Sequence, residues 1–279
     1  QANSITLREL LQQYKSDETS KKKGAYSEGT KIDKLCRQDI VKCTLAKITP
    51  LKIKTFRDEW LKTHNPSTVN KYLTLINIAI KYARDLLGIY LPNNPCDYVK
   101  RLKEPEFEGQ VIEQHEEELL LKHSEKSKAS WLKLAIMLGI DCGMRRGEIL
   151  SIQRSDVSFN KSTAILRDTK NGTSRAIGLS PRVIEEMEKL PVALDGKLIN
   201  CRSEEQFKFY WKQLKRWANI NKTFHSTRHT FASRMAMKGW TITEIAQQGG
   251  WKELKVLKRY THLKAEYLAD KLKQRPNRD

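Results

Sequence analysis

The stretch 162–179, STAILRDTKNGTSRAIGL, decides the fold class of this chain of 279 residues. Two short runs that contain alternating apolar residues flank the dipeptide Asn171-Gly172, which readily adopts the positive φ angles of a type I′ turn. The stretch therefore predicts a β-hairpin. Apolar residues at helical spacing on both sides of it make the expected fold mainly α with a small antiparallel β-sheet, an α+β fold.

Helical patterns occupy most of the remaining sequence. The patterns in the first part predict helices over 6–14, 31–43, 51–64 and 67–87, with a polar loop over 16–30 and no strand. The patterns in the second part predict helices over 113–123, 131–140, 181–190, 203–217, 226–238 and 243–248, and from 252 onward. The first hundred residues therefore predict an all-helical bundle.

A change in composition separates the two parts. KEPEFEGQ, residues 103–110, combines Pro, Gly and charged residues without periodicity. We therefore expect a helical domain at 1–104, a linker at 105–112 and a second domain, with the hairpin, at 113–279.

The charge indicates a polyanionic partner. The chain has 52 Lys and Arg against 33 Asp and Glu, a net charge of +19 and a pI near 9.7. Residues 1–104 hold 20 basic against 11 acidic residues, and the remainder holds 32 against 22. Because both parts are basic, two lobes closing on one DNA duplex fit better than a basic tail; a merely solvated basic surface or attraction to anionic lipid is the alternative.

Several classes of protein are excluded by the sequence. The longest apolar run, 134–140, is far shorter than the roughly 20 residues of a membrane span. The N-terminus has no secretory signal and no initiator Met, so we expect a chain that is processed or truncated. The five cysteines form no CxxC pair with matching histidines, so we expect reduced thiols in a cytoplasmic protein, no disulfide framework and no zinc site.

Two segments carry candidate basic groups near the hairpin. CGMRRGEIL (142–150) places Arg145 at the start of a helix, where backbone donors and a guanidinium both suit a phosphate; a solvated arginine pair near Glu148 is the alternative. Lys170 directly precedes the hairpin turn, where an ammonium aimed at a leaving oxygen would be a general acid. Most lysines beside turns are only solvated, which is the alternative there.

A third segment, HSTRHTF (225–231), combines a histidine with an arginine. His225 and Arg228 stand three residues apart at a helix start, so both lie on one side of its first turn. Histidine transfers protons near neutral pH, and arginine binds phosphate oxygens. This spacing is common by itself, and the neighbouring His229 is expected to be structural.

The fourth segment, GGWKELKVLKRYTHL (249–263), contains Trp251 and Tyr260. Tyr260 continues the apolar face of an amphipathic pattern, so core packing alone also predicts a tyrosine there. Nine residues would put the two rings on opposite sides of a straight helix. They can meet at one point only if a break or a bend separates them.

Taken in order, these groups resemble the tyrosine recombinase (phage integrase) family. The matching positions are the R-x-x-E block at Arg145 to Glu148, the hairpin lysine at Lys170, the H-x-x-R box at His225 and Arg228, the His/Trp position at Trp251, and the nucleophile at Tyr260 in RYTH. The resemblance spans 113–275, whereas 1–104 resembles only the family's helical core-binding domain. The chain departs from the family at Cys142, which replaces the usual Thr before Gly, and at Trp251, which replaces the commoner His.

The resemblance implies a site-specific recombinase that needs no metal, ATP or other cofactor. Tyr260 would attack the scissile DNA phosphate and give a 3′-phosphotyrosine and a free 5′-hydroxyl. The other implied roles are the phosphate clamp for Arg145 and Arg228, protonation of the 5′-oxygen for Lys170, proton transfer for His225, phosphate positioning for Trp251, and support of these groups for Glu148 and His229.

The resemblance also implies partners. These are double-stranded DNA with specific sites, a homotetramer on DNA that forms through the amphipathic C-terminal helix after Tyr260, and accessory DNA-bending or directionality proteins. Packing of that helix on its own domain is the alternative. An arm-binding domain, which integrases often carry at the N-terminus, is not seen here.

The subtype is left open by the sequence. The family's phage and genomic-island integrases and its shufflon-type invertases are the most similar. We expect integration and excision of a mobile element first, and DNA inversion or dimer resolution second. A type IB topoisomerase, or a basic DNA-binding protein without activity, are the alternatives from other classes, and Tyr267 is the competing tyrosine.

Overall fold

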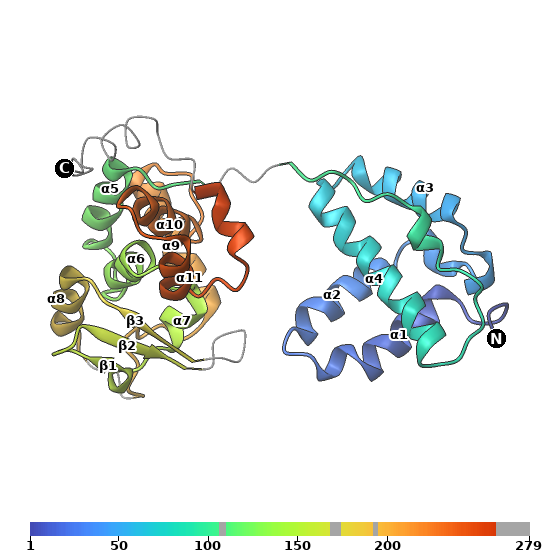
Figure 1. Cartoon of the computed structure of the whole chain (residues 1–279), viewed down its shortest axis with the longest axis horizontal. Helices are drawn as coiled ribbons and strands as arrows, with labels where there is room; N and C mark the ends of the chain where they lie inside the picture. The colour runs from blue at the N-terminus through green and yellow to red at the C-terminus, as the bar shows by residue number, and fades with distance from the viewer. Residues whose placement is uncertain (106–109, 168–173, 192–194, 261–279) are drawn as a thin grey trace, which may run out of the picture. The chain divides into compact units, whose positions relative to one another are not determined.

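The computed structural model of the chain describes residues 1–105, 110–167, 174–191 and 195–260, except for the side chains of residues 258 and 259. The chain divides into two compact units, Gln1–Phe107 and Glu108–Asp279 (Figure 1). Each unit has its own hydrophobic core. The division falls inside the segment 105–112.

The first unit consists of helices around one apolar core. Its elements are α1 (Leu7–Asp17), η1 (Thr19–Lys21), α2 (Ala25–Leu35), η2 (Asp39–Lys42), η3 (Leu45–Lys47), α3 (Pro50–Leu61), α4 (Pro66–Asp85) and η4 (Pro95–Tyr98). The longest helix, α4, starts where the Asn65 side chain accepts a hydrogen bond from the Thr68 amide and Pro66 occupies the first turn. Its apolar face, with Val69 and Ile76, is buried in the core.

The loop predicted over 16–30 is wrong. The helix α1 extends to Asp17 and α2 already begins at Ala25, although the start of α2 shows no apolar periodicity. The core face of α2 is narrow: it buries Gly29, Ile32 and Leu35, and the rest of the helix is largely solvated. Helical spacing of apolar residues therefore identifies only the second half of α2.

The second unit combines helices with one small sheet. Its elements are α5 (Gln114–Ser124), α6 (Leu132–Asp141), α7 (Arg146–Ser151), η5 (Arg154–Asp156), β1 (Val157–Ser158), β2 (Thr163–Leu166), β3 (Arg175–Gly178), α8 (Pro181–Lys189), α9 (Glu204–Ala218), α10 (Ser226–Met237), α11 (Ile242–Gly249) and η6 (Leu254–Tyr260). The helices from α5 to α11 start and end within two residues of the predicted bounds where the sequence predicted them.

The sheet is antiparallel, in the order β1-β2-β3. The strands β2 and β3 pair from Thr163 opposite Gly178 to Leu166 opposite Arg175, as a hairpin requires. The turn residues Asn171 and Gly172 lie outside the described residues. The sequence did not predict β1, because two residues are too short for an alternating pattern. The mainly α fold with a small antiparallel sheet is confirmed.

Close packing of α6 against α10 fixes where the HSTRHTF segment lies. A Cβ atom on Gly139 of α6 would lie 2.3 Å from the Oγ1 atom of Thr227, so only glycine allows this approach. At the end of α6, Gly143 turns the chain with φ +65° against the ring of Phe231. Two glycines thus bring the start of α7 beside α10.

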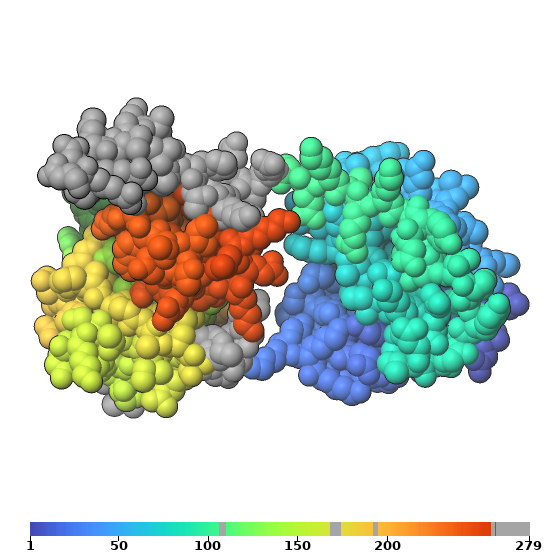
Figure 2. Space-filling model, viewed as in Figure 1, coloured from blue at the N-terminus to red at the C-terminus, as the bar shows by residue number. Residues whose placement is uncertain are grey.

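The helix α11 is attached to the edge of the sheet. The Gln248 side chain accepts a hydrogen bond from the Gly178 amide at 2.9 Å and donates one to the Gly178 carbonyl at 2.8 Å. The amide group thus pairs with β3 as another strand would. In Figure 2 the yellow surface that includes β3 adjoins the orange surface that includes α11.

No helix among the described residues is long and apolar enough to cross a membrane.

We predict that Gly143→Ala destabilises the second unit by about 2–5 kcal/mol. The new Cβ would lie 2.5 Å from the Phe231 ring, and φ +65° itself costs an alanine about 1–2 kcal/mol. Thermal unfolding of the purified chain measures the effect as a drop in Tm. The control is Gly147→Ala in α7, where nothing lies within 4 Å of the new methyl, so Tm should stay or rise slightly. Equal melting of both variants would contradict this packing.

Candidate active site

Arg145 begins α7 and is held there by Glu148. Its backbone amide donates to Glu148 Oε2 at 2.8 Å, and its Nη1 donates to Glu148 Oε1 at 2.8 Å. The carboxylate is almost fully buried, with 6% of the residue exposed. The R-x-x-E spacing thus places Glu148 in the first turn of α7, where its side chain binds Arg145, the residue just before the helix.

A second arginine, Arg175 of β3, binds the same carboxylate. Its Nη1 and Nη2 donate to Glu148 Oε1 and Oε2 at 2.7 and 2.9 Å, the two-pronged geometry that suits a guanidinium. Burial alone would raise the pKa of Glu148, yet the bonds from Arg175 and Arg145 hold it below its usual range. Glu148 is therefore ionised at neutral pH.

Three consecutive carbonyls at the end of α11 accept hydrogen bonds from arginines. The Gln248 carbonyl accepts from Arg175 Nε, the Gly249 carbonyl from Arg175 and Arg228, and the Gly250 carbonyl from Arg145. Carbonyls at a helix C-terminus carry partial negative charge and lack partners within the helix. Gly250, with φ +72°, leaves room for the guanidinium of Arg175, and Gly249 leaves room for the ring of Trp251.

Arg228 of α10 is the most buried of the three arginines, with 2% of the residue exposed. Its Nη1 donates to the carbonyls of Gly143 and Gly249, and its Nε has no hydrogen-bond partner among the residues that the structure describes. Burial, followed by the positive charge of Arg145, lowers the pKa of its guanidinium to about 9. It is still protonated at neutral pH, and an anion beside it would be stabilised strongly.

The charges in this cluster are not balanced. Arg145, Arg175 and Arg228 surround one carboxylate, Glu148, which leaves two positive charges in excess in a largely buried place. Buried charge is costly unless it is paired. A dianionic or monoanionic oxyanion, such as a phosphate group, would lower that cost, so the cluster fits an anion site.

His225 lies at the start of α10, on the same side as Arg228. Burial, then the charges of Arg228 and Arg145, lower the pKa of the imidazole below its ordinary value. The ring is neutral at pH 7 and able to accept a proton. It also contacts His229 edge to face, with ring centroids 4.7 Å apart.

Trp251 lies directly after the Gly249-Gly250 turn and stacks on Arg228. The guanidinium carbon is 4.2 Å from the centroid of the indole, a cation–π contact, and the ring also lies parallel to Phe231. Over residues 252–260 the structure differs from the helix predicted from 252 onward, and the rest of that prediction lies outside the described residues. The segment Leu254–Tyr260 is a 3-10 helix, and Trp251 stands before it, so the two aromatic residues are not on one straight helix.

Tyr260 is half-buried and reaches the HSTRHTF segment through its hydroxyl. The hydroxyl forms a hydrogen bond with Nδ1 of His229, and the two ring centroids are 5.7 Å apart. Tyr260 also packs at the edge of the small core that contains Phe231 and Leu257. The ring thus packs on an apolar cluster, as the amphipathic pattern predicts, and its hydroxyl points to the residue that follows Arg228.

Of the predicted site residues, the structure brings seven together: Arg145, Glu148, His225, Arg228, His229, Trp251 and Tyr260. Lys170 lies outside the described residues, as does the predicted C-terminal helix. Arg175, Gln248 and the α11 carbonyls were missed. One signal could have found Arg175. It stands two residues before buried Ile177 on β3 and therefore on the same, core-facing side of the strand, where a charge needs a buried partner.

A pocket of about 950 Å³ opens on this cluster. Its lining includes Arg145, His225 and Arg228 together with the lysines Lys208 and Lys215 of α9. Among all its lining residues, five are Lys or Arg and two, Glu148 and Glu204, are acidic. A pocket with such walls attracts polyanions.

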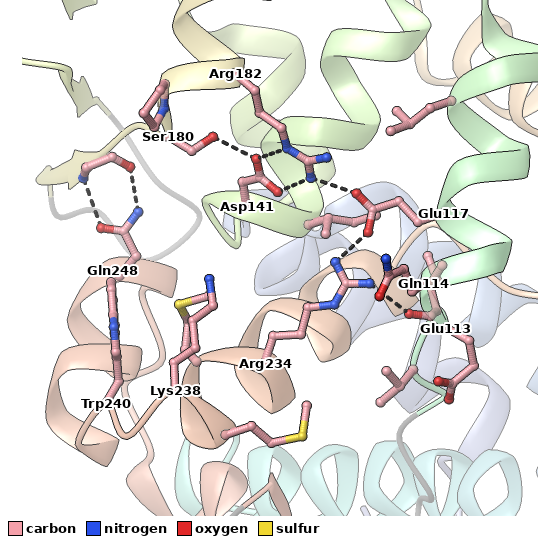
Figure 3. Close-up of a pocket in the computed structure, with 18 of the residues that line it drawn as sticks. Glu113, Gln114, Glu117, Asp141, Ser180, Arg182, Arg234, Lys238, Trp240 and Gln248 are labelled. Atoms are coloured by element: carbon pink, nitrogen blue, oxygen red, sulfur yellow. Dashed lines mark hydrogen bonds and ion pairs between the residues drawn. The ribbon is translucent and has the colours of Figure 1, made fainter.

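A second, larger pocket of about 1,100 Å³ lies elsewhere in the unit (Figure 3). Its floor carries a network in which Arg182 binds Asp141 and Glu117, and Arg234 binds Glu117 from the other side. These charges satisfy one another, in contrast to the arginine cluster around Glu148. None of the predicted site residues lines it, so its size does not make it the active site.

An anion site built from arginines, with a neutral histidine and a tyrosine hydroxyl beside it, fits an enzyme that acts on phosphodiesters. The family model described as "Phage integrase family" matches residues 110–266, more than half of the chain. The chain belongs to the phage integrase family, the tyrosine class of site-specific recombinases. The resemblance inferred from the sequence is confirmed.

Known relatives agree. The chain is 30% identical to the shufflon-specific DNA recombinase of Escherichia coli, over 97% of this chain and 72% of that protein. It is 27% identical to a putative integrase/recombinase of Haemophilus influenzae, over 91% and 71%.

Solved structures share the fold. The Tn1549 transposon integrase in complex with circular intermediate DNA has a TM-score of 0.78 at 17% identity, covering 96% of this chain and 99% of that one. The lambda integrase tetramer bound to a Holliday junction has a TM-score of 0.77 at 19% identity, covering 92% and 78%.

We predict that His225 titrates below pH 6.5 in the DNA-free protein and that Arg145→Gln raises its midpoint. Removing a positive charge favours the imidazolium. Because the folded pKa is lowered, the unfolded state takes up the proton first, so this group lowers the stability of the fold as pH falls below about 6.5. NMR titration of the imidazole Cε1 proton measures the midpoint.

The matched control is Arg146→Gln. Arg146 is the next residue, but its Nη2 is bound to Glu204 at 2.6 Å, and the charges that lower the pKa of His225 are those of Arg228 and Arg145. An unchanged His225 midpoint in Arg145→Gln, or an equal change in both variants, would contradict the described electrostatics.

Proposed function

We propose that this enzyme cleaves and rejoins double-stranded DNA at specific sites through a 3′-phosphotyrosine formed on Tyr260. The observation that carries the proposal is the arginine cluster: Arg145 and Arg228 lie beside Glu148 and the α11 carbonyls with positive charge in excess, and the Tyr260 hydroxyl is bonded to the residue after Arg228. A scissile phosphate bound there would have a nucleophile close by.

In the proposed cleavage, the phenolic oxygen of Tyr260 forms a bond to phosphorus while the bond from phosphorus to the 5′-oxygen breaks. Arg145 and Arg228 bind the non-bridging oxygens, whose negative charge increases in the transition state. The phenol loses a proton and the 5′-oxygen gains one, so the proton count balances. Rejoining is the reverse, with a 5′-hydroxyl as nucleophile, and the phosphoester energy is kept in the covalent bond.

The proton transfers are assigned to three residues. His229 accepts the phenol proton, since its Nδ1 is the hydrogen-bond partner of the Tyr260 hydroxyl. The neutral His225 beside it assists, and Lys170 protonates the departing 5′-oxygen as the family resemblance implies. Trp251 acts mainly through Arg228, because its ring covers the guanidinium face. The family resemblance implies only a supporting role for His229, and we propose proton transfer as an additional role.

Double-stranded DNA is the proposed substrate. The basic walls of the 950 Å³ pocket continue from Arg145 to Lys208 and Lys215 of α9, which suits a run of phosphates on either side of the scissile one. Both units of the chain carry excess positive charge. The Tn1549 transposon integrase, which has a similar fold, was solved in complex with circular intermediate DNA, which supports the same substrate class here.

The proposed reaction is integration and excision of a mobile element. Inversion is the second candidate, because the 30% identity to the shufflon-specific recombinase extends over 97% of the chain. Four subunits on two duplexes, held together through the C-terminal segment, are proposed by analogy with the lambda integrase tetramer bound to a Holliday junction. Accessory bending or directionality proteins are proposed from the family resemblance alone.

We predict that Tyr260→Phe abolishes covalent protein–DNA complexes. The phenyl ring keeps the apolar contacts with the Phe231 cluster but has no oxygen to form the phosphoester. The test incubates wild type and variant with nicked fragments of the host genome, denatures them in SDS and counts the DNA that partitions with protein. Sequencing the trapped ends identifies the cleavage site.

Tyr267→Phe is the control, since it removes a hydroxyl seven residues away and should leave trapping unchanged. If Tyr260→Phe still traps DNA, or if wild type traps none, the proposed chemistry is wrong. Strand exchange between two marked duplexes that carry the recovered site separates a recombinase from a topoisomerase, which would relax supercoils without exchange.

A further inference from the structure

Arg175 is bound into the arginine cluster but lies outside the pocket. Its side chain, with 14% of its surface exposed, comes from β3, and it is not among the residues that line the 950 Å³ pocket, whereas Arg145, Glu148 and Arg228 are. We propose that Arg175 is a positioning residue for DNA cleavage: it holds Glu148 and the end of α11 so that Arg145 faces the scissile phosphate. This inference rests on the proposed function.

The donors of Arg175 are directed at protein groups. Two bind the oxygens of Glu148, one binds the Gln248 carbonyl at 3.3 Å, and one binds the Gly249 carbonyl at 3.2 Å. A guanidinium has five N–H donors, so this arrangement uses four of them. Arg175 therefore has little capacity left for a phosphate, and its influence on a substrate has to pass through the groups that it holds.

Those groups are shared with Arg145. Each oxygen of Glu148 accepts one bond from Arg175 and one from Arg145, and the Arg145 guanidinium continues to the Gly250 carbonyl. The orientation of Arg145 is thus fixed by Glu148 and by the Gly250 carbonyl. Arg175 binds Glu148 directly and also binds the carbonyl of Gly249, the residue before Gly250. Loss of Arg175 would free the carboxylate to rotate and the α11 end to move.

The contact with α11 is close as well as polar. A Cβ atom on Gly250 would lie 2.5 Å from the Arg175 guanidinium carbon, so the turn before Trp251 packs directly on this side chain. Gln248 reinforces the attachment through its paired bonds to Gly178 on the same strand. One strand residue thereby connects the sheet, the start of α7 and the turn that carries Trp251.

A lysine cannot replace this arginine. The site requires two parallel bonds to a carboxylate and two more to carbonyls in a nearly buried place, which a planar fork provides and a single ammonium does not. We expect Arg175→Gln to slow single-turnover cleavage about 100-fold, as a displacement of about 1 Å in a catalytic group does, and Arg175→Lys to recover only part of it.

The experiment uses the full chain and a suicide duplex carrying the cleavage site found by sequencing trapped ends. The variants are Arg175→Gln, Arg175→Lys, Arg145→Gln and, as matched control, Arg167→Gln. Arg167 lies just after β2, and its exposed side chain binds only Asp156 among the described residues. DNA affinity by fluorescence anisotropy and Tm are measured alongside the cleavage rate.

A neutral scissile linkage separates positioning from general damage. A methylphosphonate carries no negative charge, so it depends less on arginines that neutralise charge. If Arg175 acts through Arg145, the loss of rate in Arg175→Gln and in Arg145→Gln should both shrink on the methylphosphonate. A variant that is merely less folded loses the same factor on both substrates.

Three results would overturn the inference while leaving the proposed function intact. The first is a cleavage rate of Arg175→Gln equal to that of Arg167→Gln, and the second is an equal loss of rate in Arg175→Gln on the phosphate and the methylphosphonate. The third is a cleavage rate of Arg175→Lys equal to that of wild type. If Arg145→Gln and Tyr260→Phe also cleave like wild type, the proposed function itself is wrong, and the inference falls with it.

Discussion

The active site depends on one buried carboxylate. Glu148 accepts two bonds from Arg145 and two from Arg175, and in the described part of the chain it is the single acidic group among three guanidinium groups. Without it, three like charges would face one another in a poorly solvated place, where removing one partner of a buried pair costs about 3–5 kcal/mol. Its position follows from chain geometry, because Glu148 is the third residue of α7 and its side chain can therefore reach the backbone amide of Arg145, the residue before the helix.

The same constraint explains why the site suits a phosphodiester. The α11 carbonyls and Glu148 hold the arginines in place but do not neutralise them, and burial followed by the positive charge of Arg145 lowers the pKa of Arg228. An anion is the missing partner, and it enters a site whose donors are already oriented. The excess positive charge thus lowers the stability of the DNA-free protein. When DNA is bound, the same charge favours binding and stabilises the transition state.

Much of this could be predicted from the sequence, because the relevant signals are local. Helix periodicity, the Asn-Gly turn and the R-x-x-E and H-x-x-R spacings each act within one or two turns of chain. The start of α2 and the 3-10 helix Leu254–Tyr260 could not be predicted in this way. The start of α2 has few apolar contacts, and the 3-10 helix depends on contacts with residues distant in the sequence. For Arg175 the strand pattern indicates at most a buried partner, and it does not reveal which residues these are, because its four bonds all go to residues 27 or more positions away.

The most direct test of the account is a crystal structure of the protein trapped on its DNA site. We expect continuous electron density from the Tyr260 oxygen to a 3′-phosphate, with Arg145 and Arg228 bound to the non-bridging oxygens and Arg175 still bound to Glu148. A phosphate joined to another side chain, or one that neither Arg145 nor Arg228 contacts, would contradict it.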